Sequence, residues 1–348
     1  MKIGKVEAAV IPFGPFAEPI SDALQTLPGA GGVRVTVTTE TGVSGVGEVR
    51  FGRGEGAAQA VTVLVEGALG PLIVGRELEP LDIHRALRRE TEYYGAFGLA
   101  NFAIAAIDVA LWDCLGKEQG VPCWQLWSKV RDRVPAYAMV GWLNYDADKL
   151  QRICAQAVEQ GFRMVKIKVG LPTLAEDVER VRLTRSAVGD GIAISVDANQ
   201  VLTVEDAIER GKAFQDLGCL WWEEPLPAAD IDGYARLAEA LEIPIATGEN
   251  LYTPEDFERF LRRNAVDIVQ PDLRRAGGPT ALLEIGRLAH ESGRPYASHG
   301  GEPAQLSVMA CLQNAIYLET GLLRADSPMK LVDGCVQIPQ GPGFAWDR

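Results

Sequence analysis

The sequence predicts an α/β fold in which a smaller α+β domain precedes a closed barrel of parallel strands. Two observations support this prediction. Alternating strand patterns near the N-terminus are followed by helical patterns, and from about residue 134 short apolar runs alternate repeatedly with amphipathic helices. The chain has 348 residues, of which 47% are hydrophobic, so it is long enough for about two domains with ample cores.

Residues 1–128 are predicted to form the α+β domain. Val33, Val35 and Val37 alternate with polar residues, which is typical of a half-buried strand, and a Glu-Thr-Gly turn at 40–42 leads into a return strand. The predicted strands of this antiparallel meander are 2–12, 33–39 and 43–50, and the predicted helices are 55–70, 81–91 and 99–117. The last helix is so apolar that we expect it to pack on both sides.

Residues 129–324 are predicted to form the barrel. The apolar runs that we interpret as strands are 134–141, 164–169, 192–198, 219–224, 244–249, 266–272, 296–299 and 316–320. Thr203, and Thr253 followed by Pro254, are typical starts of the helices between them. Eight strands that alternate with helices favour a closed, compact (β/α) barrel. An open doubly wound sheet is the alternative, but its usual glycine-rich phosphate loop is not evident after the first strand.

The charge balance disfavours several classes of partner. Lys and Arg number 34 against 47 Asp and Glu, whereas proteins that bind nucleic acids or anionic membranes normally present a basic face. The N-terminus lacks the apolar core of a signal peptide, and the uncharged stretch from Tyr93 to Ile107 is predicted to be a buried helix. The six cysteines form no C-x-x-C pair, which favours reduced thiols in a cytoplasmic protein.

Ionisable residues end seven consecutive predicted barrel strands. They are Lys166 and Lys168, Asp197, Glu223 or Glu224, Glu249, Asp272, His299 and Glu319. The C-terminal strand ends of such a barrel form its active-site mouth, so we expect these side chains to converge there. Any one of them alone is as well explained as a solvated loop residue, but the joint pattern indicates a site.

Asp197, Glu223 and Glu249 are predicted to bind a divalent cation. Three converging carboxylates repel one another unless a cation lies among them. An all-oxygen set of ligands suits Mg²⁺, which leaves other coordination positions to water and substrate. The set contains no His or Cys, which disfavours zinc.

Candidate acid–base groups flank these carboxylates. Lys166 and Lys168 are two residues apart on one strand and therefore share a face. We expect the two ammonium groups to lower each other's pKa, which can make one of them a neutral base. On the other flank, Asp272 is expected to hold His299 in one tautomer as a second acid–base group.

These motifs together resemble the enolase superfamily. They are KIK at 166–168, DAN at 197–199, EEP at 223–225, GEN at 248–250, QPD followed by GG at 270–278, SH at 298–299, and Glu319. The lysine pair with the Asp–His dyad resembles the mandelate racemase subgroup, whereas the muconate-lactonizing type would carry a lysine on the sixth strand. The resemblance covers nearly the whole chain. It implies a modified TIM (β/α) barrel with an N-terminal α+β capping domain, which the segment 325–348 completes.

The resemblance also implies roles for individual residues. Asp197, Glu223 and Glu249 are expected to bind Mg²⁺, which holds the substrate carboxylate and stabilises the enediolate formed when the α-proton leaves. Lys168 is expected to be the base on one face of the α-carbon, and Lys166 to lower its pKa.

On the opposite face, His299 is the implied acid or base and Asp272 orients it. Glu319, protonated or otherwise donating a hydrogen bond, is implied to support the second carboxylate oxygen of the substrate. Asn199 is expected to lie next to the lysines or the substrate.

Two loops of the capping domain, about 13–32 and 50–56, are expected to close over the substrate. The first has an apolar lining formed by Phe13, Pro15, Phe16, Pro19, Ile20 and Leu27. In the second, Arg50 and Arg53 are candidates to meet a second anionic or hydroxyl group of the substrate. Gly300 and Gly301 after His299 are expected to leave that side of the pocket open.

The remaining histidines and a tryptophan pair are interpreted as structural. His84 and His290 are predicted to be surface residues. Trp221 and Trp222 are predicted to belong to the barrel core and to helix packing.

Two activities require this same set of residues. In a lyase, Lys168 or His299 takes the α-proton, and His299 delivers a proton to the departing 3-hydroxyl group. In a racemase or epimerase, the two bases serve opposite faces of one carbon. Dehydration of an acid sugar to a 2-keto-3-deoxy acid is preferred, because this activity is the commonest one attached to the residue set in the family.

A non-catalytic relative is disfavoured, because every expected catalytic position is filled. The expected partner is a small-molecule carboxylate, with Mg²⁺ as the cofactor and neither nucleic acid nor membrane involved. The protein is expected to be a cytoplasmic homo-oligomer.

Overall fold

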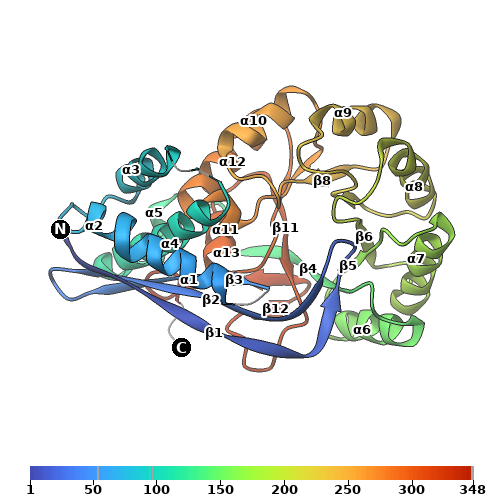
Figure 1. Ribbon diagram of the computed structural model, residues 1–348. Helices are drawn as coiled ribbons and strands as arrows, with labels where there is room; N and C mark the ends of the chain where they lie inside the picture. The colour runs from blue at the N-terminus through green and yellow to red at the C-terminus, as the bar shows by residue number, and fades with distance from the viewer. Residues whose placement is uncertain (53–54, 94, 96, 346–348) are drawn as a thin grey trace.

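The computed structural model describes residues 1–52, 55–93, 95 and 97–345. It places an N-terminal sheet and its helices beside a barrel that is surrounded by helices (Figure 1). The N-terminal sheet is a three-stranded antiparallel meander, as predicted, with the strands β1 (Ile3–Ser21), β2 (Thr26–Thr39) and β3 (Ser44–Phe51). Val33, Val35 and Val37 are fully buried, which confirms the alternating pattern in β2.

Helices cover one face of this sheet. They are α1 (Gly56–Leu64), the π-helical turn η1 (Val65–Leu69), α2 (Gly70–Ile73) and α4 (Leu99–Gln119). Helix α3 (Pro80–Glu92) and the short helix α5 (Cys123–Leu126) pack on α4 instead. Helix α4 packs directly on β3 at Gly47, where an added Cβ atom would lie 2.0 Å from the carbonyl oxygen of Ala106. This close approach explains the burial of most of α4, which confirms that it packs on both sides.

Two helical stretches are long and apolar enough to cross a membrane by length and composition alone. They are Gly56–Ile73 and Leu99–Gln119. Of the second window, 83% is buried inside the protein. In the first, Val61, Val65 and Leu69 are fully buried at a spacing of four residues, so this stretch turns one face to the N-terminal core.

His84 is buried, and the prediction that it lies at the surface is wrong. Its ring Nε2 lies 3.0 Å from the carbonyl oxygen of Gly277, on a turn of the barrel that packs against α3. The sequence pattern of α3 gave no sign of this contact, because the partner is far away in the chain. His290 is exposed, as predicted.

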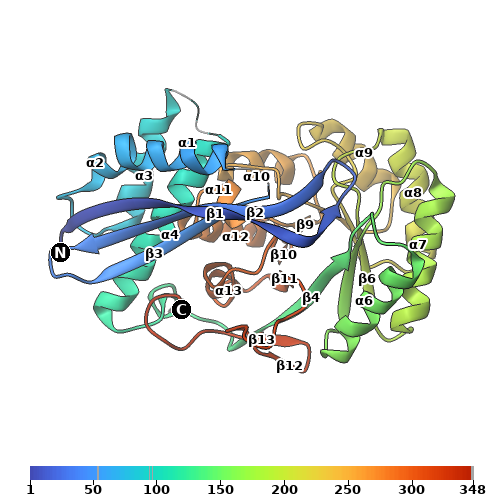
Figure 2. The same cartoon turned by 60° about the horizontal axis from the view of Figure 1, so that its bottom comes forward.

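Strands β1 and β2 extend far beyond the predicted strands, so much of the expected loop 13–32 is a long β-hairpin. Pro15 and Pro19 are tolerated because β1 is an edge strand and its register shifts between Pro15 and Ile20. The hairpin reaches from the N-terminal sheet to the barrel in both views (Figures 1 and 2). There the backbone N–H of Leu143 donates to the carbonyl oxygen of Ser21 (2.8 Å).

The barrel contains the eight predicted strands in the predicted order. They are β4 (Arg133–Gly141), β5 (Met164–Lys168), β6 (Ala193–Asp197), β7 (Trp222–Glu223), β8 (Ile245–Thr247), β9 (Ile268–Val269), β10 (Tyr296–Ala297) and β11 (Ala315–Thr320). All neighbouring pairs are parallel, and β11 pairs with β4 through Leu318 opposite Ala136. This pairing closes the barrel, so the open doubly wound alternative is wrong.

Helices connect successive barrel strands. They are α6 (Ala147–Glu159), α7 (Leu174–Val188), α8 (Val204–Asp216), α9 (Ile231–Ala240), α10 (Pro254–Arg262), α11 (Leu273–Ala276), α12 (Pro279–Glu291) and α13 (Pro303–Met309). Thr203 caps α8 by accepting from the backbone N–H of Asp206, and Thr253 forms a capping box at α10 with Pro254 in the first turn. Both predicted helix starts are confirmed.

The two tryptophans divide between the inside and the outside of the barrel. Trp221 belongs to a small buried cluster with Tyr137 and Met164 inside it. Trp222 belongs to the larger core between strands and helices, where its ring lies 5.3 Å from that of Phe214. The predicted structural roles are confirmed.

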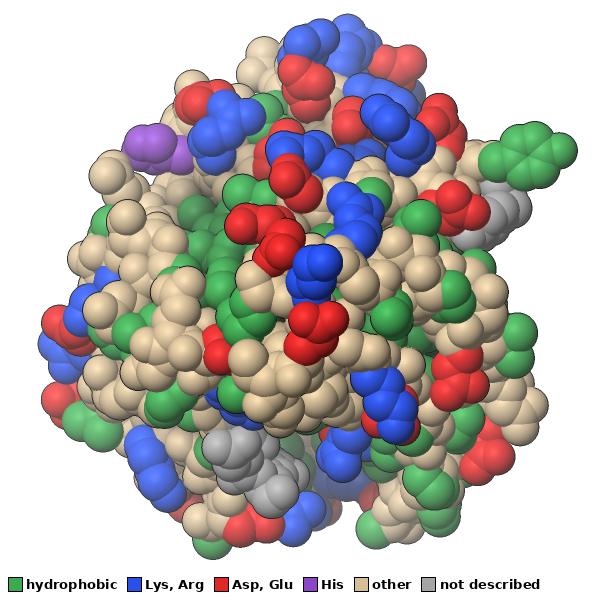
Figure 3. Space-filling view, turned by 90° about the vertical axis from the view of Figure 1, so that its left-hand side faces the viewer, with side chains coloured by type: hydrophobic (Ala, Val, Ile, Leu, Met, Phe, Trp, Pro, Cys, Tyr) green, Lys and Arg blue, Asp and Glu red, His purple; other side chains and the backbone are tan. Residues whose placement is uncertain are grey.

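The C-terminal segment contacts both parts of the chain. It contains β12 (Leu331–Val332) and β13 (Cys335–Gln337), and β13 pairs antiparallel with β4. Further on, the backbone N–H of Phe344 donates to Asp113 of α4 (2.9 Å). The division of the chain at residues 128 and 324 stays a prediction. All six cysteines are unpaired, and on the face seen in Figure 3 acidic and basic side chains are interspersed.

Candidate active site

The predicted site residues converge at the C-terminal ends of the barrel strands. The strand register places Lys168 beside Asp197, and Asp197 beside Glu223. Because neighbouring parallel strands are in register here, side chains from successive strands meet at one end of the barrel. These three residues are at most 4% exposed.

Asp197, Glu223 and Glu249 form a buried cluster of carboxylates. One oxygen from each lies within 4.8 Å of the other two. Burial raises the pKa of Glu223 to about 8, and the charge of Asp197 adds to this effect while Lys166 opposes it. Three buried oxygen ligands so close together fit a hard divalent cation such as Mg²⁺, which would relieve their mutual repulsion.

The two lysines lie against this acidic cluster. Lys166 Nζ donates to Glu223 Oε1 (2.6 Å) and also contacts Glu319, whereas Lys168 Nζ contacts Asp197. Burial would lower the pKa of each ammonium group, but the surrounding carboxylates raise both. This direction is opposite to the expected mutual lowering, because the carboxylates around each ammonium group outweigh the neighbouring lysine.

On the other flank, Asp272 and His299 form the predicted dyad. The ring Nδ1 of His299 lies 2.7 Å from Asp272 Oδ2, and its Nε2 lies 2.8 Å from Glu249 Oε2. The pKa of His299 is raised well above its usual value: burial would lower it, but Glu249, Glu319 and the hydrogen bond to Asp272 together raise it more. Asp272 thus fixes one ring nitrogen, and the other nitrogen faces the acidic cluster.

Glu319 is held as a carboxylate, and not as the protonated group that the resemblance implies. Burial would raise its pKa, but Lys166 and His299, with hydrogen bonds from Lys166 and Tyr137, lower the pKa to about 2. The hydroxyl group of Tyr137 donates to Glu319 Oε2 (2.6 Å). The fixed positive charges around Glu319 are the physical reason for the difference.

Two further residues, Gln270 and Tyr137, belong to this network and were not predicted from the sequence. The side chain of Gln270 donates to Glu223 Oε2 (2.8 Å) and to the hydroxyl group of Tyr137 (3.0 Å). Gln270 lies two residues before Asp272 in the β9 segment, and this period-two spacing was the available signal. Tyr137 carried no comparable signal, because an inward aromatic residue on a barrel strand is ordinarily core.

Asn199 lies at the edge of the acidic cluster, as expected. Its backbone N–H donates to Asp197 Oδ1 (2.9 Å), and its φ of 45° is a left-handed conformation that Asn tolerates. Its side chain is buried, and Oδ1 has no partner among the described residues. The side-chain amide is therefore available to a ligand in the mouth.

A pocket lies between the capping domain and the dyad. Its volume is about 330 Å³, and its lining comes from the hairpin, the end of β3 and the residues after β9: Gln25, Leu27, Arg50, Phe51, Gly52, Ala57, Phe102, Asp272, Arg274 and Arg275. Leu27 and Arg50 were predicted to belong to lids over the substrate, and both line this pocket. Arg53, the other arginine proposed for this role, lies outside the described residues.

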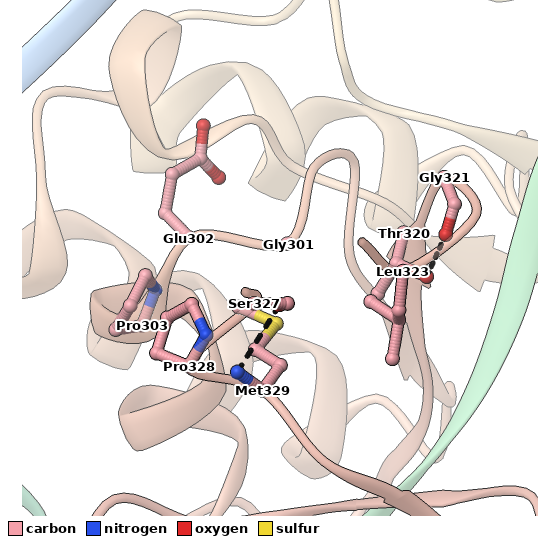
Figure 4. A pocket seen from close by; sticks show the side chains of 9 residues that line it. All are labelled: Gly301, Glu302, Pro303, Thr320, Gly321, Leu323, Ser327, Pro328 and Met329. Carbon is pink, nitrogen blue, oxygen red and sulfur yellow. Dashed lines mark hydrogen bonds between the residues drawn. The ribbon is translucent and has the colours of Figure 1, made fainter. Parts of the chain in front are cut away.

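A second pocket lies beside the loop that follows β10 (Figure 4). It has a volume of about 330 Å³ between the start of α13, the end of β11 and the C-terminal segment, and Gly301, Glu302 and Thr320 contribute to its lining. None of the predicted catalytic or metal-binding residues lines this pocket, so the prediction that Gly300 and Gly301 leave the substrate pocket open stays a prediction. A Cβ atom at Gly301 would lie 2.4 Å from the carbonyl oxygen of Glu319, so the loop packs tightly on β11.

Fold and site together define a barrel protein with a capping domain and an acidic metal-binding cluster between two acid–base groups. The family model for the N-terminal domain of mandelate racemase / muconate lactonizing enzyme matches residues 5–127, and the enolase C-terminal domain-like model matches residues 149–347. The chain belongs to the mandelate racemase / muconate lactonizing enzyme family of the enolase superfamily.

Similar proteins include both lyases and isomerases. Arabinonate dehydratase of Saccharolobus solfataricus is 35% identical over 324 residues, which cover 91% of this chain and 86% of that protein. A racemase from Streptomyces coelicolor, solved with bound magnesium, has a TM-score of 0.92 and 31% identity, with 98% of this chain and 96% of the other covered.

L-talarate/galactarate dehydratase from Salmonella typhimurium, liganded with Mg and L-lyxarohydroxamate, has a TM-score of 0.91 and 32% identity, over 99% of this chain and 90% of the other.

Proposed function

We propose that this protein is a Mg²⁺-dependent acid-sugar dehydratase that removes the α-proton of a carboxylate substrate and yields a 2-keto-3-deoxy acid. The observation that carries the proposal is the placement of Lys168 and His299 against different members of one acidic cluster, Asp197 and Glu249. Two acid–base groups on opposite flanks of a metal site can serve opposite faces of one carbon. The dehydratases among the similar proteins support this choice.

The cluster of Asp197, Glu223 and Glu249 would hold the cation. When bound, Mg²⁺ supplies Lewis-acid stabilisation of the negative charge that develops on the substrate carboxylate. Lys166 would bind the substrate carboxylate from the side of β5, and the ionised Glu319 of β11 would hold the ammonium group of Lys166 in place, since the two contact each other.

Lys168 would take the α-proton on its face of the substrate once a cation on the cluster offsets the carboxylate charges that raise its pKa. His299, held by Asp272 through Nδ1, would deliver a proton from Nε2 to the departing 3-hydroxyl group. Closure of the hairpin would keep bulk water away from these proton transfers. Asn199 would bind a substrate hydroxyl group through its unpartnered carbonyl oxygen or its amide.

Arg50 is our candidate for the recognition of the distal end of the substrate. Arg274 and Arg275 line the same pocket, but carboxylates of the site engage them, namely Asp272 and Glu249. In the described part of the chain Arg50 pairs with Glu48, and its side chain is 48% exposed. A half-exposed guanidinium in an otherwise partly apolar pocket suits a hydroxyl or carboxylate group at the far end of an acid sugar.

A panel of aldonic and aldaric acids with Mg²⁺ tests the proposal. A carbonyl-trapping reagent should detect a 2-keto-3-deoxy product from at least one member. Optical change without a keto acid would instead assign the protein as a racemase or epimerase, the second candidate, which the racemase of similar structure supports. No reaction in either assay would contradict both.

We further propose that the protein acts as a cytoplasmic homo-oligomer without nucleic acid or membrane partners. The similar enzymes act on small molecules, and the unpaired cysteines suit a reducing compartment. Light scattering coupled to size-exclusion chromatography should give a mass above the 37.6 kDa of one chain. A mass of one chain would contradict the oligomer.

A further inference from the structure

Two consecutive arginines follow β9 and turn toward different parts of the site. Nε of Arg274 lies 3.2 and 3.1 Å from the two carboxylate oxygens of Asp272, and its Nη2 contacts Oδ2. Nη1 of Arg275 instead donates to the backbone carbonyl oxygen of Glu249 (3.0 Å) and reaches Glu249 Oε1 (3.4 Å). One arginine thus binds the partner of His299, and the other binds a candidate metal ligand.

We propose that Arg274 and Arg275 are positioning residues with separate tasks: Arg274 fixes the Asp272–His299 dyad, and Arg275 fixes Glu249 in the metal-binding cluster. The assignment of these tasks to catalysis rests on the proposed function. The contacts themselves do not depend on it, so the experiments below use the metal alone and the free protein.

The Arg274 contact restricts the orientation of a buried carboxylate. Asp272 is 1% exposed and caps α11 by accepting the backbone N–H groups of Arg274 (2.8 Å) and Arg275 (2.9 Å) at Oδ1. Its Oδ2 must then serve both the guanidinium of Arg274 and the ring of His299. The planar guanidinium spans both oxygens and therefore fixes the plane of the carboxylate that orients His299.

The Arg275 contact fixes both the main chain and the side chain of Glu249. The carbonyl bond holds the end of β8, and the side-chain contact leaves Glu249 Oε2 directed toward His299. Asn250 also donates to Glu249 Oε1 (3.1 Å), so this oxygen has one neutral donor, Asn250, and one cationic donor, Arg275. A metal ligand whose other contacts are fixed loses less freedom when it binds the ion.

Helix α4 of the capping domain fixes the turn that carries these arginines. Asn101 donates through its amide nitrogen to the carbonyl oxygens of Arg275 (2.8 Å) and Tyr252 (2.7 Å). Two residues after α11, Gly278 has a φ of 100°, and an added Cβ would lie 2.7 Å from the side chain of Asp108. The turn is therefore held against α4 at two points, which fixes the backbone that carries both arginines.

Titration with Mn²⁺, followed by electron paramagnetic resonance without substrate, tests the task of Arg275. We expect Arg275→Met to raise the Kd for Mn²⁺ by about 10-fold or more, since removal of such supporting contacts typically costs this much. Arg274→Met should leave the Kd within about 2-fold of the parent protein, on the same scale of effects. Arg287→Met is a matched surface control, because among the described residues Arg287 pairs with the exposed Glu291 on α12.

The imidazole signals of protein labelled with ¹⁵N-histidine test the task of Arg274. The chain has three histidines, which keeps the spectrum simple. Arg274→Met should shift or broaden the signal of the Nδ1–H of His299, whereas Arg275→Met should leave this proton bonded to Asp272. Arg274→Lys and Arg275→Lys, which keep a charge but lose the planar fork, should restore part of each effect.

Three results would overturn the proposal. They are an unchanged Kd for Mn²⁺ in Arg275→Met, an unchanged His299 signal in Arg274→Met, and equal loss of both properties in both variants. If circular dichroism shows that a Met variant does not fold, the corresponding Lys variant replaces it. Its Kd for Mn²⁺ and its His299 signal are then compared with those of the parent protein. A protein that turns over no acid sugar but shows the split in metal affinity would contradict the proposed function and not this assignment.

Discussion

The barrel mouth and the interface between α4 and the barrel are both buried and polar, but they satisfy their polar groups differently. At the interface, Asp108 accepts from the backbone N–H and the hydroxyl group of Thr280, and Trp112 donates to the same hydroxyl group (2.8, 2.8 and 2.9 Å). At the mouth, Asn199 Oδ1 and Gln270 Oε1 have no partner in the described part of the chain.

This difference separates residues that stabilise the fold from residues that await a ligand. Among the described residues, unpartnered buried atoms also occur elsewhere, such as Nε1 of Trp127, whose ring packs on that of Trp112. Those at the mouth lie beside three like charges, and this combination indicates an absent ligand. We therefore expect substitutions at the mouth to change activity more than stability, and substitutions at the interface to do the opposite.

The largest effect is expected for the three carboxylates. Asp197→Asn, Glu223→Gln and Glu249→Gln should each lower turnover by about 10³-fold or more, because metal stabilisation of developing charge is worth several kcal/mol. For Glu223→Gln the melting temperature should fall little or rise, since burial raises the pKa of Glu223 to about 8. Glu249→Gln should lower it more, because burial would raise the pKa of Glu249 but His299 and Arg275 hold it well below its usual value. Calorimetry and steady-state kinetics measure the two quantities. Full activity in excess EDTA, or unfolding of all three variants, would contradict the metal site.

The two acid–base groups should show a stereochemical split. Lys168→Ala should keep solvent deuterium exchange from the face served by His299, and His299→Asn should keep exchange from the other face. Each rate that is lost should fall by about 10²-fold or more. Nuclear magnetic resonance of the recovered substrate measures the exchange at each face. Exchange that neither substitution affects would remove both residues from the mechanism.

Regions of local regularity were predictable from the sequence, whereas contacts between distant segments were not. The barrel strands and their charged ends followed from apolar runs and from the rule that parallel strands end at one edge. The long hairpin was not predicted, because Pro15 and Pro19 are typical of loops unless the strand lies at an edge. His84 was misplaced, because only its tertiary partner Gly277 buries it.

The same limit applies within the site. The acidic triad and the dyad carried signals in residue type and spacing. The charge states did not, because they depend on how many carboxylates surround each lysine and on which cations surround Glu319. The sequence shows that Arg274 and Arg275 are consecutive. It does not show that their side chains bind different carboxylates, because this depends on the backbone geometry of α11.

Next to this interface, His84 of α3 packs against the turn at Gly277, and we expect it to make the free energy of unfolding depend on pH. Burial and the charge of Arg88 lower the pKa of its ring from 6.5 to about 4. Between these values the unfolded chain binds a proton that the folded protein does not, so the free energy of unfolding decreases as pH falls below about 6.5. At pH 5 this loss amounts to about 2 kcal/mol, at 1.36 kcal/mol per pKa unit.

Urea denaturation of the parent and of His84→Gln measures this effect. The Gln variant keeps a donor for the carbonyl oxygen of Gly277 but does not titrate. From pH 7 to pH 5, the free energy of unfolding of the parent should fall by about 2 kcal/mol relative to that of the Gln variant. Parallel pH profiles would show that His84 does not titrate as a buried neutral group. Activity per folded molecule at pH 7 should be the same in both, in contrast to the variants of the mouth.

The smallest effect is expected where the hairpin meets the barrel, because this contact is polar but exposed. Asn144 accepts from the backbone N–H of Ser21 (3.0 Å) and donates to the carbonyl oxygen of Pro19 (2.8 Å). In the same loop, the centroid of the Trp142 ring lies 5.5 Å from Nζ of Lys168. Asn144→Ala removes two exposed hydrogen bonds, which together are worth about 0.7–1.4 kcal/mol, so kcat/KM should fall by about 3- to 10-fold, mainly through KM. The free energy of unfolding should change by about 1 kcal/mol or less, since water replaces these exposed bonds in the open state. Faster proteolysis within the hairpin, measured together with KM, would link the loss to opening of the hairpin. A fall in kcat with KM unchanged would instead show that Asn144 acts on the chemistry through Trp142, and the hairpin would then belong to the mouth and not to a lid above it.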